Sequence, residues 1–226
     1  PTPCLETILR FFAVAEHAFT LMLTLAKNII PVSNEYREIG FAAKNHAPGI
    51  EMTGKTLGLI GMGRIGKHIL HMCRDGLDMH VIVYDPYISE VPEGVEKVDD
   101  LSELLRRADV VTLHCLLTDE TRKLIDRERL ALMKPTALLI NCARGPIVDE
   151  AALIEALENG RLAGAGLDVT APEPVAPDSP LFKLPNVIVT PHYAPTTVES
   201  ATRVSKIAAE NINAVLAGQE PVGRIV

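Results

Sequence analysis

The sequence predicts an α/β protein, a doubly wound parallel sheet with helices on both faces. Short apolar runs alternate with helical segments along most of the 226 residues. One apolar run, residues 57–60, leads directly into Gly61, Gly63 and Gly66, the G-x-G-x-x-G spacing that opens a helix after a strand. A carboxylate, Asp85, ends the next apolar run, about 20 residues further on, as a dinucleotide-binding unit requires.

The first part of the chain predicts two helices before any strand. Residues 11–30 are apolar nearly all round, which is typical of a helix buried in a core or a subunit interface, and Pro31 is expected to close it. Glu16, His17 and Lys27 interrupt this run, which argues against a membrane span. A second short helix is expected over 34–40, and a loop over 44–54.

The glycine loop predicts a dinucleotide site. Gly61 permits a tight turn, Gly63 lets a pyrophosphate approach the backbone, and Gly66 allows the new helix to pack against the strand. The helix start, with Arg64 and Ile65, offers its N–H groups and positive dipole end to phosphates, and Asp85 would bind the ribose hydroxyls. The alternative is a plain strand–turn–helix with a solvated aspartate, which the combined spacing disfavours.

The remaining elements continue the alternation. A loop rich in proline and glycine follows Asp85, and another, over 171–180, is stiffened by prolines. The helix over 149–159 has Asp149 as its N-cap and Gly160 as its stop. The expected strands are 56–61, 80–84, 109–114, 137–142, 163–169 and 187–190, and the other expected helices are 64–75, 101–107, 127–133 and 196–217.

Several polar residues fall where these strands end. In such a sheet, ligands bind beyond the carboxyl ends of the strands. Asp85, His114, residues 142–145, Asp168 and His192 are therefore expected on the cofactor side. His114 is interpreted as a structural or cofactor-lining residue, not as an acid.

Composition narrows the class of partner and compartment. The net charge of −7 argues against a nucleic acid or an anionic membrane. The histidines and cysteines have no metal-ligand spacing, so no metal is expected. Three of the cysteines lie in predicted apolar helices or strands, which favours free thiols in a reducing cytoplasm over a disulfide framework. The cysteines are Cys4, Cys73, Cys115 and Cys142, and the histidines expected to be solvated or on a helix surface are His46, His68, His71 and His80.

Short segments along nearly the whole chain carry a family resemblance. They are Val14-Ala-Glu-His17, Thr53-Gly-Lys-Thr-Leu-Gly58, Leu113-His114, Leu117-Thr118, Asn141-Cys-Ala-Arg-Gly145, Gly166-Leu-Asp-Val169, Glu173-Pro174, Thr190-Pro-His192 and Ala208-Ala-Glu-Asn211. The chain resembles the NAD-binding domain of the D-isomer-specific 2-hydroxyacid dehydrogenases, which include phosphoglycerate, glyoxylate-hydroxypyruvate and glycerate dehydrogenases. Several such segments in order are more specific than a glycine loop alone.

The resemblance implies three catalytic residues. Arg144 would hold the substrate carboxylate, His192 would be the general acid and base, and Glu173 would orient and stabilise the His192 ring. Asp168 would contact the nicotinamide amide, and Cys142 would line the cofactor site. Read without the family, Arg144 and Glu173 would be solvated loop residues and His192 a helix cap, since no spacing assembles them.

Three positions depart from the family pattern. Residue 116 is leucine where proline is common, and residue 142 is cysteine where threonine is usual. Pro195 stands where the family tends to have glycine. Because proline has a fixed φ and no N–H, Pro195 is expected to alter the loop beside His192.

We expect one NAD-binding domain over residues 1–226, with its core at 51–192, interface helices at 11–45 and a C-terminal helix at 196–217. The substrate domain that precedes this region in the family is expected to be largely absent, so the chain alone would bind NADH but reduce 2-keto acids very slowly. The predicted function is hydride transfer between NAD(H) and a small 2-hydroxy or 2-keto acid, in a cytoplasmic homodimer. The alternatives are a non-catalytic, NAD-sensing module like the family's co-repressors, and a short-chain dehydrogenase, against which the lack of a Tyr-x-x-x-Lys pair argues.

Overall fold

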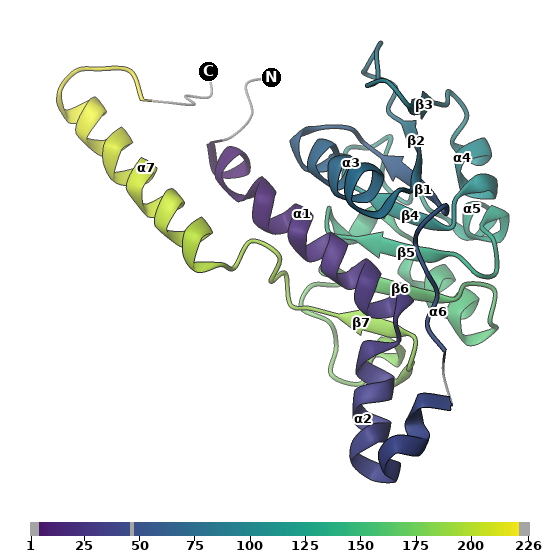
Figure 1. Ribbon diagram of the computed structural model, residues 1–226. Coiled ribbons are helices and arrows are strands. Elements are labelled where there is room, and N and C mark those ends of the chain that lie inside the picture. Colours follow the sequence, from purple (N-terminus) through teal and green to yellow (C-terminus); the bar gives the residue numbers. More distant parts are fainter. Residues whose placement is uncertain (1–4, 46–47, 222–226) are drawn as a thin grey trace.

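The computed structural model describes residues 5–45 and 48–221, so Cys4 and His46 lie outside the described residues. Its centre is one parallel sheet in the order β3-β2-β1-β4-β5-β6-β7, with helices on both faces (Figure 1). This confirms the predicted fold class. The strands are β1 (Thr56–Ile60), β2 (His80–Tyr84), β3 (Val95–Lys97), β4 (Val110–Leu113), β5 (Leu138–Asn141), β6 (Gly164–Leu167) and β7 (Val187–Val189).

The helices divide between the two faces. One apolar core, which includes Leu104, Leu130 and Leu153, lies under the helices α4, α5 and α6. The other, which includes Leu21 and Ile69, lies under α1 and α3. The α-helices are α1 (Leu5–Ala26), α2 (Ile29–Ile39), α3 (Arg64–Leu77), α4 (Leu101–Arg107), α5 (Arg127–Leu132), α6 (Glu150–Glu158) and α7 (Val198–Leu216), and the 3-10 helices are η1 (Gly40–Asn45), η2 (Gly145–Ile147) and η3 (Pro180–Lys183).

The central strands supply both cores at once. Every residue of β4, β5 and β6 is buried. In β5, Leu139 belongs to one core and its neighbours Leu138 and Ile140 to the other, because successive side chains of a strand point to opposite faces. Continuous apolar runs therefore mark strands that are covered on both sides.

The first predicted helix is two helices, so the expectation that Pro31 closes it was wrong. The helix α1 ends at Ala26, and Asn28 takes a left-handed conformation with φ of 50°. The next helix, α2, begins at Ile29, earlier than the predicted start at residue 34, and has Pro31 in its first turn. Proline is tolerated there because the first N–H groups of a helix have no partner within the helix.

The short edge strand β3 was also missed, because only Val95 of its three residues is apolar and no alternation is visible. The other predicted strands and helices are confirmed to within two residues at each end. The predicted caps of α6 are confirmed as well: Asp149 accepts from the Ala152 N–H at 3.3 Å, and Gly160 has φ of 64°.

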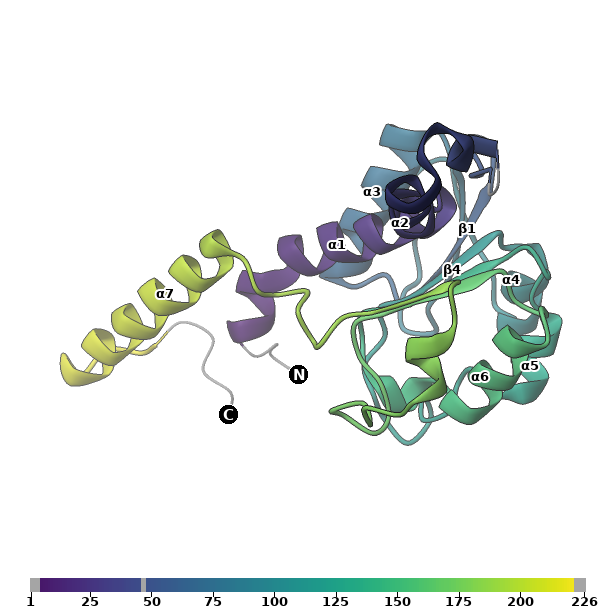
Figure 2. The same cartoon turned by 90° about the horizontal axis from the view of Figure 1, so that it is seen from below.

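The last helix, α7, extends away from the sheet, as the views from two directions agree (Figures 1 and 2). Within α7, Ser200 alone is buried. In the described part of the chain, no helix is both long enough and apolar enough to cross a bilayer.

Candidate active site

The glycine loop that follows β1 needs two of its glycines, Gly61 and Gly66, for steric reasons. Gly61 has φ of 90°, and a Cβ there would lie 2.7 Å from the Cys115 nitrogen. A Cβ on Gly66 would lie 2.3 Å from the Gly61 oxygen, so the helix can approach the strand only without one. A Cβ on Gly63 would meet no atom within 4 Å, which leaves the backbone open to a ligand. The turn at Gly61 and the close packing at Gly66 are as the spacing predicts.

The start of α3 faces this open space. Gly63 is the N-cap residue of α3 and makes no side-chain cap. No side chain of that residue therefore competes with a ligand for the N–H groups at the start of the helix. Such a helix start, next to an accessible backbone, fits the pyrophosphate of a dinucleotide. The Arg64 side chain is exposed beside it, and Ile65 is partly buried.

Asp85 joins the end of β2 to the glycine loop. Its Oδ2 accepts from the Met62 N–H at 2.8 Å, and its Oδ1 accepts from the Tyr87 N–H at 3.0 Å. The two bonds hold the carboxylate at the edge of the loop. This is the position that a group binding the ribose hydroxyls of a dinucleotide requires.

A cavity of about 160 Å³ beyond the strand ends brings together residues that the sequence places far apart. It combines Ile65 from α3 with residues that follow β5, β6 and β7. Arg10 and Phe11, from the start of α1, were not predicted and carry no recognisable motif. The lining consists of Arg10, Phe11, Val14, Ile65, Cys142, Arg144, Asp168, His192, Ala194 and Pro195.

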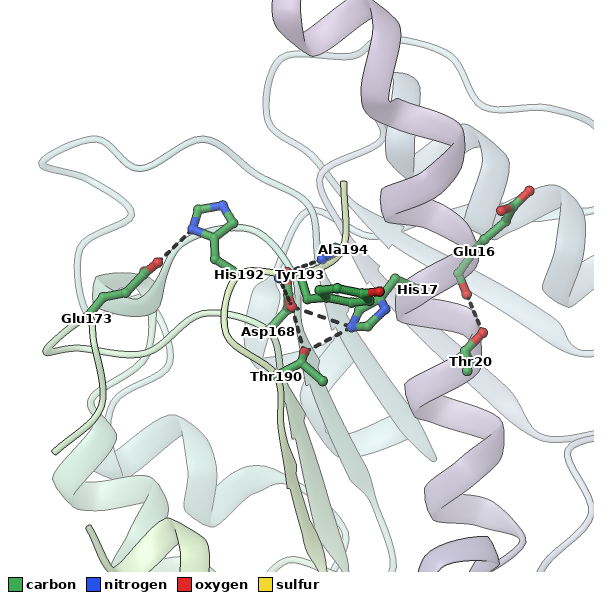
Figure 3. A network of polar contacts seen from close by, with 9 residues as sticks. All are labelled: Glu16, His17, Thr20, Asp168, Glu173, Thr190, His192, Tyr193 and Ala194. Carbon is green, nitrogen blue, oxygen red and sulfur yellow. Dashed lines mark hydrogen bonds and ion pairs between the residues drawn. The ribbon is translucent and has the colours of Figure 1, made fainter. Parts of the chain in front are cut away.

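His192, which lines this cavity, forms a hydrogen-bonded pair with Glu173 (Figure 3). The His192 Nδ1 lies 2.7 Å from the Glu173 Oε1, and both side chains are 43% exposed. Both residues line a second cavity of about 660 Å³, and His192 lines the first cavity as well, so its ring borders two open spaces. Since Glu173 engages Nδ1, the Nε2 atom is left to exchange a proton with a ligand.

Arg144 follows β5 in a turn that Asn141 shapes. The Asn141 side chain accepts from the Ala143 N–H at 3.0 Å and donates to the Arg144 carbonyl at 3.1 Å. The Arg144 Nη1 donates to the Ala143 carbonyl at 2.6 Å, and the side chain is exposed at the cavity. An exposed guanidinium at this place can bind a carboxylate by two parallel hydrogen bonds.

Asp168 is buried and holds the segment that carries His192. Its Oδ1 accepts from the Thr190 hydroxyl at 2.6 Å and the Tyr193 N–H at 2.7 Å, and its Oδ2 accepts from the Ala194 N–H at 3.0 Å. The sequence indicated a contact to the cofactor, but not this structural role. Pro195 fits the segment, because the turn is closed by the next residue, Thr196, whose N–H donates to the Tyr193 carbonyl at 2.8 Å.

His114, which the sequence indicated as a structural or cofactor-lining residue and not as an acid, hydrogen-bonds within the fold. Its Nε2 lies 2.8 Å from the Thr112 hydroxyl, and its Nδ1 is shielded from water and has no partner in the part of the chain that the structure describes. Burial lowers the pKa of His114 to about 3, so the ring is neutral. A neutral buried imidazole cannot serve as an acid at ordinary pH.

The cysteines near the site are free thiols whose pKa values are raised. Cys115 and Cys142 lie just beyond β4 and β5, and not inside the strands as predicted. Burial raises the pKa of Cys115 to about 11, and burial together with the Asp168 carboxylate raises the pKa of Cys142 further. Among residues 5–45 and 48–221, no group of histidine, cysteine and acidic residues could hold a metal ion.

Comparison with known proteins agrees with this geometry. Residues 19–194 match the family described as D-isomer specific 2-hydroxyacid dehydrogenase, NAD binding domain. The D-3-phosphoglycerate dehydrogenase of Methanocaldococcus jannaschii is 47% identical over 210 residues, which cover 92% of this chain and 40% of that protein. The chain thus spans less than half the length of that relative.

Solved structures show the same fold. The TT0316 protein of Thermus thermophilus has a TM-score of 0.90 at 40% identity, over 96% of this chain and 69% of that one. The D-lactate dehydrogenase of Aquifex aeolicus, complexed with NAD and lactic acid, has a TM-score of 0.83 at 32% identity, over 93% of this chain and 68% of that one. The chain therefore belongs to the D-isomer specific 2-hydroxyacid dehydrogenase family, through the NAD binding domain of that family.

Proposed function

We propose that this chain is the NAD-binding domain of an oxidoreductase that transfers hydride between NAD(H) and a small 2-hydroxy or 2-keto acid. The observation that carries the proposal is the cavity that joins Ile65 of the cofactor helix to Arg144 and His192. An anion-binding guanidinium and a proton-exchanging imidazole beside a dinucleotide loop are the groups that 2-keto-acid reduction needs.

The proposed reaction divides the work among three side chains. When bound, NADH supplies the hydride to the carbonyl carbon of the substrate. Arg144 binds the substrate carboxylate and orients the adjacent carbonyl, a task suited to a permanently charged, planar group. His192 transfers a proton from Nε2 to the carbonyl oxygen, and in the reverse direction takes it back. Glu173 holds the ring through Nδ1 and stabilises its protonated form.

We also propose the cofactor contacts. The backbone at Gly61, Gly63 and Gly66 with the start of α3, at Arg64 and Ile65, would hold the pyrophosphate, and Asp85 the adenosine ribose. Asp168 and Cys142 would lie at the nicotinamide end, because both line the same cavity as His192. The family's substrate domain would supply the opposite wall of the cleft.

A turnover assay on the full-length protein distinguishes this proposal from an NAD-sensing, non-catalytic module. NADH oxidation is measured with glyoxylate, hydroxypyruvate and 3-phosphohydroxypyruvate as separate substrates. We expect saturable reduction of at least one of them. Tight NADH binding with no reduction of any would contradict the enzyme and support the co-repressor-like alternative.

The cofactor is expected to be NAD(H) in preference to NADP(H). The Asp85 carboxylate would repel a 2′-phosphate, and residues 86–89 contain no arginine or lysine to bind one. Titration should give a Kd for NADH at least about tenfold below that for NADPH. The variant Asp85→Ser should bring the Kd values for NADH and NADPH closer together. Asp178→Ser, in an exposed loop, should leave both Kd values unchanged. Tighter binding of NADPH by the unaltered protein would contradict the assignment.

We propose that the protein forms a homodimer through α1, α2 and η1. Large apolar side chains remain exposed along these elements, and clusters of exposed apolar side chains usually mark an interface. They are Phe12, Ile29, Ile30, Ile39 and Phe41. Light scattering at micromolar concentration should give the mass of two chains. Ile30→Glu should lower that mass, and Leu116→Glu, at an exposed apolar residue outside these elements, should not. A single-chain mass for the unaltered protein would contradict the proposal.

The remaining partners follow from composition. The net charge of −7 supports a small-molecule partner over a nucleic acid or an anionic membrane. The described cysteines Cys73, Cys115 and Cys142 are free thiols, which supports a reducing, cytoplasmic location.

A further inference from the structure

His17, on α1, contacts the segment that carries His192, although the two are far apart in the sequence (Figure 3). Its Nε2 lies 2.9 Å from the Thr190 Oγ1 and 3.5 Å from the Asp168 Oδ1. The His17 side chain is 17% exposed and Asp168 only 1%, so the contact is largely shielded from water. His17 has no role in the proposed reaction, but its ring joins α1 to the segment that carries His192.

The direction of each hydrogen bond follows from its neighbours. The Thr190 hydroxyl donates its hydrogen to the Asp168 carboxylate at 2.6 Å. A hydroxyl has one hydrogen, so its oxygen accepts from His17, and the His17 Nε2 must carry a hydrogen. The resulting chain runs from His17 through Thr190 to Asp168. It supports a buried carboxylate, which is stable in a protein interior only when it is well hydrogen-bonded.

Asp168 in turn fixes an unfavourable backbone conformation at His192. The φ of His192 is 53°, which side chains other than glycine seldom adopt. The His192 N–H donates to the Asp168 carbonyl at 2.8 Å, and the Asp168 carboxylate accepts from the next two backbone N–H groups. Such a conformation persists only where surrounding contacts outweigh its cost. The His192 ring is aimed at Glu173 and at the cavity from this backbone.

We propose that His17 is a positioning residue for His192, acting through Thr190 and Asp168 to hold the 190–194 segment in place. His17 does not touch the reacting atoms. The kinetic consequence rests on the proposed function, because it needs His192 to be the proton donor. A sub-ångström displacement of such a donor is enough to slow a reaction strongly.

The experiment uses four single variants of the full-length protein and one double variant, which combines His17→Leu with Thr190→Val. His17→Leu removes the donor and keeps the bulk, His17→Gln keeps an N–H donor, and Thr190→Val removes the hydroxyl that joins the two ends. His80→Leu is the matched control, since His80 is exposed at the start of β2, and the site lies beyond the other ends of the strands. Circular dichroism and the melting temperature first establish that each variant is folded.

We expect His17→Leu and Thr190→Val each to lower kcat by about tenfold, with the Kd for NADH changed by less than about twofold. The double variant should lose little more than either single variant, because both break one chain of contacts. His17→Gln should recover most of the loss, and His80→Leu should behave as the unaltered protein. By NMR, the downfield proton of His192 Nδ1 should weaken in His17→Leu and persist in His17→Gln.

Unchanged kcat in folded His17→Leu, or a loss that His17→Gln does not recover, would overturn the proposal. If His17→Leu does not fold, a Thr190→Val protein with unchanged kcat and an unchanged His192 proton would overturn it. Failure of the proposed function has a different signature, in which the unaltered protein reduces no 2-keto acid. The NMR signal of His192 still tests the positioning role in that case, because it does not depend on turnover.

Discussion

Replacing His192 with alanine in the full-length protein is expected to lower kcat for 2-keto-acid reduction by about 10³-fold, the typical contribution of a general acid. The imidazole is the group at the cavity that pairs with a carboxylate through one nitrogen and keeps the other for a ligand. The Kd for NADH should change by less than about twofold, because the glycine loop and Asp85 are untouched. Steady-state kinetics and NADH fluorescence titration measure the two quantities.

Glu173→Gln is the informative companion variant. It keeps an oxygen that can accept from the His192 Nδ1 and removes the charge that stabilises the protonated ring, so a smaller loss in kcat is expected. His80→Ala should have no effect, since this side chain is exposed at the start of β2. Normal turnover by His192→Ala would show that the proton donor has been assigned to the wrong residue.

Replacing Gly145 with alanine is expected to destabilise the fold by about 3 kcal/mol or more, an unusually large effect for one methyl group. A Cβ at this position would lie 1.9 Å from the Thr170 oxygen and 2.1 Å from the Thr170 carbonyl carbon. Both are backbone atoms, so no side-chain rotation can relieve the clash. The turn after β5 and the segment after β6 would have to separate, which would also displace the adjacent Arg144. Urea unfolding measures the loss.

Gly76→Ala is the matched control for this substitution. Gly76 lies in α3, and a Cβ there would meet no atom within 4 Å. Because alanine favours helices more than glycine does, the free energy of unfolding should stay level or rise by up to about 1 kcal/mol. A Gly145→Ala protein as stable as the Gly76→Ala protein would show that the two segments are not in close contact.

Local chain patterns were enough to predict most of the sheet and the dinucleotide loop. The pattern of the glycine loop is local, because a Cβ on Gly66 would lie 2.3 Å from the oxygen of Gly61, five positions earlier. The central strands are apolar throughout because both of their faces are covered. Prediction failed where the local pattern was ambiguous, as at Pro31, which a helix accepts in its first turn, and at β3, which has a single apolar residue.

The sequence by itself thus determined the fold class, the cofactor loop and the family resemblance, since each is carried by residues close together in the chain. Residue spacing could not assemble the proposed catalytic pair, which only the family resemblance implied, because Glu173 and His192 lie in separate loops whose distance depends on how β6 and β7 are arranged. It also gave no indication that His17 meets Thr190, 173 positions away. That contact exists only because α1 packs across β6 and β7, so it was decided by the tertiary structure.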